Sequence, residues 1–300
     1  MSIGEELQKK TSGVRIATQA LSMSRAMTTT QIHQVAMLFS ADHRSVRGGR
    51  AVLNRKHPLI APVLKLIHDA RSYVAARTVD YPDPGIRLIR LDQIESMTAE
   101  INKRKGELSK CLDELDEHWE EVKEDARERL KELYIESDYP AVPSTGFGIE
   151  LSFPAIAPDD RLKKLHPDLY AAEQARVAAK FQEAIEQAEA LAAAKMQELL
   201  GHFLERLSPS EDGKPKKLHE STLGNIRDAV EAFKSTTIGS NEQLDQIVAE
   251  IEALSAGVDA KSIRKASPEG RSDIEKQFAA MLKRVDELVE IRPVRQIDLD

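Results

Sequence analysis

Hydrophobic residues recur at helical spacing along most of the chain. From Ile94 to Leu133 the intervals are three or four residues, mostly in alternation, apart from one full heptad. Charged residues fill the remaining positions, which is typical of a helix with a single buried stripe. A second stripe of this kind runs from Leu169 to Phe203. The pattern therefore predicts two long helices of similar length.

The segment between these helices is short and contains the clearest strand signal. Over residues 147–153, four apolar side chains alternate with small or polar ones, and prolines stand on both sides. A short connection between two helices of similar length favours an antiparallel pair. We therefore expect a long antiparallel two-helix hairpin with a coiled-coil-like seam.

Shorter elements are predicted on both sides of this hairpin. Helical spacing of apolar residues indicates helices at about 30–40, 58–76, 219–234, 241–255 and 268–290. Alternating segments indicate short strands at 14–18, 86–90, 147–153 and 291–297. Because so few strands cannot form a β domain of their own, we expect a mainly α fold with one small β-sheet.

Breaks in these patterns divide the chain into regions. Residues 208–217, with the sequence SPSEDGKPKK, are the best candidate for a linker. We therefore predict a basic N-terminal helical region at 1–91, the hairpin at 92–207 and a C-terminal three-helix region at 218–300.

Charge is distributed unevenly along the chain. Residues 1–90 contain 14 basic and 6 acidic residues, a balance of +8, whereas the whole chain carries −7. The remaining 210 residues therefore carry −15. A basic end could bind an acidic partner, nucleic acid included, or it could pair with the chain's own acidic helix at 107–136. The sequence leaves both interpretations open.

The basic residues are concentrated around the Gly48-Gly49 pair. A flexible arginine-rich loop can bind phosphates or carboxylates through charge and paired hydrogen bonds. No aromatic residue is interleaved, and no helix-turn-helix or zinc-finger pattern occurs, so base stacking is not indicated. The candidate contacts to nucleic acid or to an acidic partner are Arg44, Arg47, Arg50, Arg55 and Lys56.

No motif of a known reaction type occurs. The chain lacks a Walker loop, a dinucleotide fingerprint and a nucleophile elbow. Cys111 is surrounded by acids, which disfavour a reactive thiolate. The pairs Glu114–His118 and Glu198–His202 are expected to lie far apart on solvated helix faces. We therefore predict no catalytic residue, no metal and no cofactor, and no small-molecule substrate is evident.

The chain has features of a cytoplasmic protein. No stretch approaches the roughly 20 apolar residues of a membrane span, and residues 1–11 are polar, unlike a signal peptide. The single cysteine rules out an internal disulfide. We expect no membrane contact.

Several proline-containing segments stand out: His57-Pro58, the block YPDPGIRLIR at 81–90, Tyr139-Pro140 and Phe153-Pro154. Together with the long acidic helix, they resemble an uncharacterised family of helical proteins encoded by bacteriophages and other mobile elements. The resemblance covers about residues 20–160 and brings no known activity or site residue. It implies a phage accessory or structural protein in the cytoplasm of a bacterial host.

These observations favour a non-enzymatic helical scaffold or binding protein that acts through protein–protein contacts, with a protein partner or with itself. The alternative is a nucleic-acid-binding protein that uses the arginine-rich segment at 43–57. A third hypothesis is an enzyme whose site is assembled from scattered residues.

Overall fold

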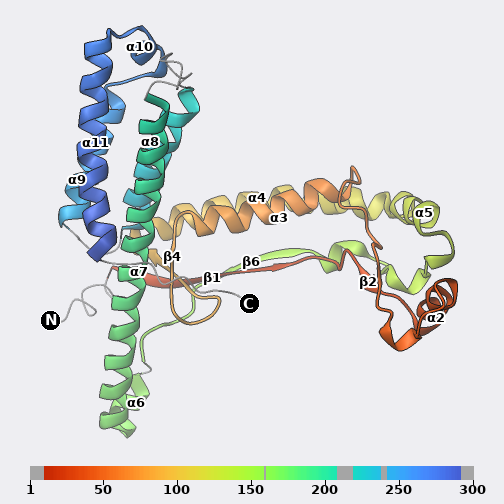
Figure 1. The fold of residues 1–300 in the computed structure, drawn as a ribbon. Helices are drawn as coiled ribbons and strands as arrows, with labels where there is room; N and C mark the ends of the chain where they lie inside the picture. Colours follow the sequence, from red (N-terminus) through yellow and green to blue (C-terminus); the bar gives the residue numbers. More distant parts are fainter. Residues whose placement is uncertain (1–9, 159, 208–218, 238–241, 292–300) are drawn as a thin grey trace. The chain divides into compact units, whose positions relative to one another are not determined.

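The computed structural model describes residues 10–158, 160–207, 219–237 and 242–291 (Figure 1). Within these residues the chain is mainly helical, with ten α-helices and a small antiparallel sheet, which confirms the predicted fold class. The predicted linker at 208–217 lies outside the described residues. So does the strand predicted at 291–297, except for Ile291, which ends a helix.

The chain forms two compact units, each assembled from separate segments. Unit 1 contains the chain up to Val14, Ala76–Asp92 and everything from Phe153 onward, and unit 2 contains Arg15–Ala75 and Gln93–Ser152. The units therefore do not follow the consecutive regions 1–91, 92–207 and 218–300. The reason is that strand β1 (Thr11–Gln19) pairs with two strands far apart in the sequence.

Each half of β1 belongs to a different unit. In unit 1, Thr11–Val14 pairs antiparallel with β5 (Arg87–Arg90), which also pairs with β4 (Val79–Asp80). In unit 2, the second half of β1 pairs antiparallel with β6 (Gly148–Ser152). The predicted strands at 14–18, 86–90 and 147–153 are thus confirmed.

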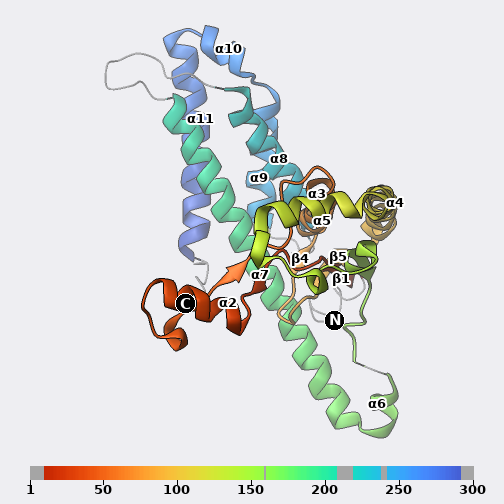
Figure 2. The ribbon, with the colours of Figure 1, turned by 90° about the vertical axis from the view of Figure 1, so that its right-hand side faces the viewer.

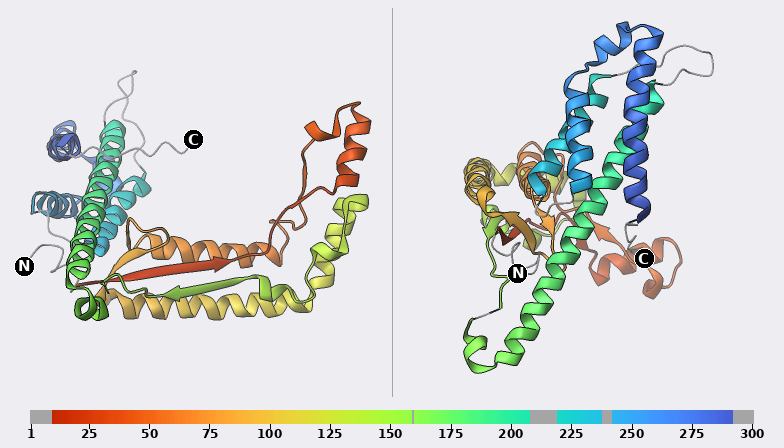
Figure 3. Two further views of the ribbon diagram at one scale, coloured as in Figure 1. Left: turned by 90° about the horizontal axis from the view of Figure 1, so that it is seen from below. Right: turned by 90° about the vertical axis from the view of Figure 1, so that its left-hand side faces the viewer.

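Unit 2 is built around two neighbouring helices, α3 (Ile60–Ala75) and α4 (Ile94–Glu117). They run side by side, and both pack against β6 (Figures 1 and 3). Their buried residues fall at helical spacing and form the predicted stripes: Ile60, Val63, Ile67, Ala70 and Val74 on α3, with Met97, Ile101, Leu108 and Leu115 on α4. The unit also contains α2 (Thr29–Leu38), β2 (Arg25–Ala26) and β3 (Gly49–Arg50).

The first of the two predicted long helices is interrupted at His118. Helix α4 ends at Glu117, and α5 (Trp119–Leu130) follows directly. At the break the hydrogen bond from Glu121 N goes to His118 O, three residues back rather than four. Helix α5 ends where Lys131 adopts φ 46° and ψ −117°, a conformation that residues other than glycine rarely adopt.

Unit 1 contains a bundle formed by the longest helix, α7 (Pro167–Leu207), with α8 (Glu220–Thr236), α9 (Glu242–Ala256) and α11 (Pro268–Ile291) (Figure 2). Phe203 and Phe278 meet in its core with ring centroids 4.5 Å apart. The short helices α6 (Asp160–Leu165) and α10 (Ala260–Lys265) precede α7 and α11. The N-terminal half of α7 packs on β4 and β5 through Tyr81 and Phe181, among others.

The partners of the two long helices differ from those expected. The sequence analysis paired them with each other, whereas α4 packs along α3 and α7 packs along α11 and α8. An apolar stripe shows that a helix face is buried, but it does not specify the element that covers it. No helix among the described residues is long and apolar enough to cross a membrane.

Candidate protein or nucleic-acid interface

The arginine-rich segment lies in unit 2, directly after α2. Thr28 caps α2 with a capping box in which its hydroxyl accepts from Gln31 N and the Gln31 side chain accepts from Thr28 N. After α2 the chain turns at Ser40 (φ 50°) into a 3-10 helix at His43–Ser45. The rings of His33 and His43 stack with centroids 4.2 Å apart, so the arginine-rich segment folds back against α2.

Four of the five predicted contact residues are available to a partner. Arg44, Arg47, Arg55 and Lys56 are exposed, and their side chains form no hydrogen bond or ion pair within the part of the chain that the structure describes. The interpretation that these four pair with the chain's own acidic helix is therefore not supported.

Arg50 has a structural role instead. It is 4% exposed, donates from Nη1 to the carbonyl oxygen of Leu133 at 2.7 Å, and places Nη2 2.9 Å from Asp138 Oδ2. The second contact is an ion pair without hydrogen-bond geometry. Because Arg50 is enclosed within unit 2, it is not a candidate for binding a partner. Arg50 thus has intramolecular partners, but they lie in the segment that follows α5 and include no acidic side chain of the helix predicted at 107–136.

An exposed apolar cluster lies beside the basic residues, and the sequence analysis did not identify it. Met37, Leu38 and Phe39, at the end of α2, are 80%, 77% and 74% exposed. The sequence pattern had predicted a helix over about 30–40 in this region. A signal was present nevertheless: three consecutive residues cannot share one face of a helix, so some of them must point outward.

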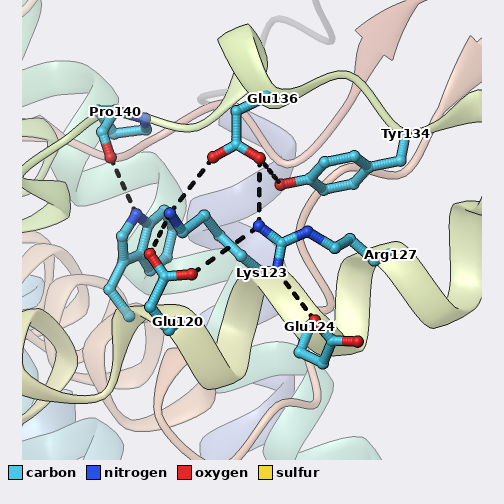
Figure 4. A network of polar contacts seen from close by, with 8 residues as sticks. Glu120, Lys123, Glu124, Arg127, Tyr134, Glu136 and Pro140 are labelled. Atoms are coloured by element: carbon cyan, nitrogen blue, oxygen red, sulfur yellow. Dashed lines mark hydrogen bonds and ion pairs between the residues drawn. The ribbon is translucent and has the colours of Figure 1, made fainter.

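A network of polar contacts holds residues 131–140 against α5 (Figure 4). Glu136 is the centre of this network: it accepts from Arg127 at 3.2 Å, from the Tyr134 hydroxyl at 2.8 Å and from Lys123 at 3.3 Å. Lys123 also pairs with Glu120, and the Trp119 indole N–H donates to Pro140 O at 2.9 Å. The loop after α5 therefore has a defined conformation.

The pKa values of this network reflect its contacts. The hydrogen bonds from Tyr134 and Arg127 lower the pKa of Glu136, so its carboxylate remains charged. Burial, together with the hydrogen bond to Glu136, raises the pKa of Tyr134 to about 12. These groups form a structural clamp of charged and neutral partners, with no group poised to titrate near neutral pH.

The other residues considered for chemistry are not arranged for it. Burial raises the pKa of the Cys111 thiol, and the charges of Glu114 and Glu107 raise it further, so a thiolate is disfavoured. One ring nitrogen of His118 lies 3.0 Å from the carbonyl oxygen of Glu114, and Glu198 pairs with Lys195. Across the described residues, no group of three or more His, Cys, Asp or Glu side chains is placed to hold a metal ion.

Comparison with known proteins provides no further guide to the site. No protein-family model, no curated protein and no solved structure matches the chain. The functional argument therefore rests on the side chains that unit 2 exposes around the end of α2.

Proposed function

We propose that this protein is a non-enzymatic helical binding or scaffold protein that acts through protein–protein contacts. The contact surface is the α2 surface, defined as Met37, Leu38, Phe39, Arg44 and Arg47. The observation that carries the proposal is the exposure of three consecutive large apolar side chains. Burying one such side chain contributes about 1.5–3 kcal/mol, so together they supply a strong reason to associate.

The charges of the α2 surface indicate the chemistry of the partner. Arg44 and Arg47 are exposed and follow the apolar cluster within ten residues in the sequence, and Arg55 and Lys56 follow in the same unit. An acidic partner that also presents apolar side chains matches both features, because the charges guide association and the apolar contact stabilises the complex.

Nucleic-acid binding is the second candidate, favoured by the same four exposed basic side chains. Phosphate contacts use basic and polar groups and would leave Met37 and Leu38 without a role. The apolar cluster therefore favours a protein partner.

The proposal also includes a biological setting. The α2 surface lies within residues 20–160, the part that resembles helical proteins of bacteriophages and mobile elements. A phage accessory or scaffold protein working in the cytoplasm of a bacterial host, with a protein partner or a second copy of itself, is the setting that this resemblance supports.

Site-specific photo-crosslinking tests the proposal. A photoreactive phenylalanine analogue replaces Leu38, and the matched control replaces Leu165, which is 73% exposed in unit 1. In bacterial extract we expect a discrete protein adduct from position 38 that position 165 does not give. Arg44→Ala with Arg47→Ala should reduce this adduct, and light scattering should show whether the partner is a second copy.

Two outcomes would contradict the proposed protein-binding role of the α2 surface. Equal adducts at positions 38 and 165 would exclude the α2 surface as the specific contact. A second assay uses a labelled oligonucleotide at low salt. Nucleic-acid binding would be the function if the oligonucleotide bound, if Met37→Ser with Leu38→Ser left its affinity unchanged, and if alanine at the four basic positions abolished binding.

A further inference from the structure

A small pocket in unit 2 lies where the 131–140 segment meets the β2–β3 ladder. Its volume is about 170 Å³, below the roughly 300–1,000 Å³ of pockets that take a whole small molecule. The apolar part of its lining comes from Leu21, Leu53, Trp119, Tyr139 and Pro140. A pocket of this volume suits a single side chain or chain terminus of a larger partner.

The walls of the pocket are fixed before any ligand binds. The Trp119 indole N–H donates to Pro140 O at 2.9 Å, and the Tyr139 hydroxyl donates to Val52 O at 3.0 Å. The clamp centred on Glu136 holds the preceding residues on α5 (Figure 4). A pre-formed site avoids the entropic cost of ordering side chains on binding.

The pocket carries one unneutralised positive charge. In the β2–β3 ladder Arg25 stands directly opposite Arg50, so their side chains project from the same face, with Cβ atoms about 4.5–5.5 Å apart. Arg50 pairs with Asp138, the only acidic residue of the lining. Arg25 lines the pocket and is exposed, and its guanidinium has no partner among the described residues. The lining thus carries one carboxylate, which Arg50 already pairs with, and a second guanidinium without a counterion.

We propose that this pocket binds a carboxylate attached to an apolar group, with Arg25 pairing with the carboxylate. An acidic side chain and the C-terminal residue of a polypeptide both present this chemistry. Arginine pairs well with the planar carboxylate, and the apolar walls accept the adjoining carbon atoms. A phosphate dianion fits less well, because Asp138 lies in the same lining. This inference rests on the proposed function and names the chemical group by which the partner would be held.

The single tryptophan of the chain gives a direct readout. Because Trp119 lines the pocket, its one indole N–H signal in a ¹H–¹⁵N NMR spectrum reports ligand binding there. The full-length protein is titrated with N-acetyl-L-leucine, with N-acetyl-L-glutamic acid α-amide and with uncharged N-acetyl-L-leucinamide. The first two distinguish a chain terminus from an acidic side chain.

We expect saturable shifts with one or both carboxylates, in the millimolar range for such small probes, and at least about tenfold weaker binding of the amide. Arg25→Gln should weaken carboxylate binding at least about tenfold. Arg25→Lys should restore part of it, which separates loss of charge from loss of folding. Arg71→Gln, at an exposed arginine of α3 outside the lining, should leave binding unchanged.

Three results would overturn the inference: equal binding of the amide, unchanged binding by Arg25→Gln, or tighter binding of inorganic phosphate or N-acetyl-L-lysinamide than of either carboxylate. These outcomes are independent of the crosslinking at position 38. If position 38 gives its adduct and the pocket does not bind carboxylates, the proposed function stands and only the pocket assignment fails.

Discussion

Arg47 and Arg50 stand three positions apart in one arginine-rich segment, yet only Arg50 is enclosed by the protein. Its partners, Leu133 O and Asp138, are more than eighty residues away in sequence. Composition and local spacing do not distinguish the two arginines, because the distinction depends on a tertiary contact. The sequence therefore predicted the basic segment as a candidate but could not separate its structural member from its exposed ones.

Replacing Arg50 should destabilise the protein far more than replacing Arg47. Arg50→Ala leaves the half-buried Asp138 carboxylate without its cation and removes the hydrogen bond to Leu133 O, so we expect a loss of about 3–5 kcal/mol. Arg47→Ala removes an exposed side chain and should change stability by less than about 0.5 kcal/mol. Urea unfolding monitored by Trp119 fluorescence measures both. Equal effects of the two substitutions would contradict the structural role of Arg50.

At the scale of elements, local signals predicted helices well and their partners poorly. The periodic stripes placed α2, α9 and α11 within about two residues of their observed ends, and Thr28 and Ser267 accept hydrogen bonds from the first turns of α2 and α11. These signals are local, since they depend on spacing and on nearby hydrogen bonds. The pairing of α4 with α3 depends on β1 joining distant strands, and no local pattern encodes that.

The apolar cluster and the pocket also differ in whether local sequence signals reveal them. The cluster at Met37–Phe39 was visible in the sequence as three adjacent apolar residues, although the analysis did not use that signal. The pocket was not visible, because it joins residues near 21–25, 53, 119 and 137–140. Only the folded chain brings these segments together.

The break between α4 and α5 should make stability depend on pH. The hydrogen bond between the His118 ring and the carbonyl oxygen of Glu114 raises the pKa of His118, and the charges of Glu121, Glu117 and Glu114 raise it further. Because the pKa of His118 is raised in the folded state, the protonated ring stabilises the fold. This stabilisation is fully present below the pKa of the unfolded state, near 6.5, and is lost as the pH rises through the pKa of the folded state. His118→Gln should therefore cost more stability at pH 5.5 than at pH 8.

Urea unfolding of the wild type and of His118→Gln at both pH values measures this difference. Using the difference between the two proteins cancels the other titrating groups, which they share. Asn102→Gln, at an exposed uncharged side chain of α4, is the matched control and should have the same effect at both pH values. An equal cost of His118→Gln at pH 5.5 and pH 8 would show that protonated His118 does not stabilise the break.

At the scale of the whole molecule, each unit has a core made from its own segments. The bundle core of unit 1 contains only residues of α7 to α11 and the connection between α9 and α10, with Phe203 and Phe278 fully buried. In unit 2, α3 and α4 bury their stripes beside β6. Among the described residues, strand β1 pairs with strands of both units. Because apolar contacts act over short distances, a cavity in one core should weaken that unit first.

Hydrogen exchange of two matched cavity variants tests this expectation. Phe203→Ala in unit 1 and Ile101→Ala in unit 2 each remove a fully buried side chain, at a cost of about 2–5 kcal/mol. Phe203→Ala should speed exchange of the amides of α8, α9 and α11, and Ile101→Ala those of α3 and α4. If either variant accelerated exchange equally in both sets of helices, the units would open together. The link would then be β1, which in the described part of the chain pairs with β5 of unit 1 and β6 of unit 2.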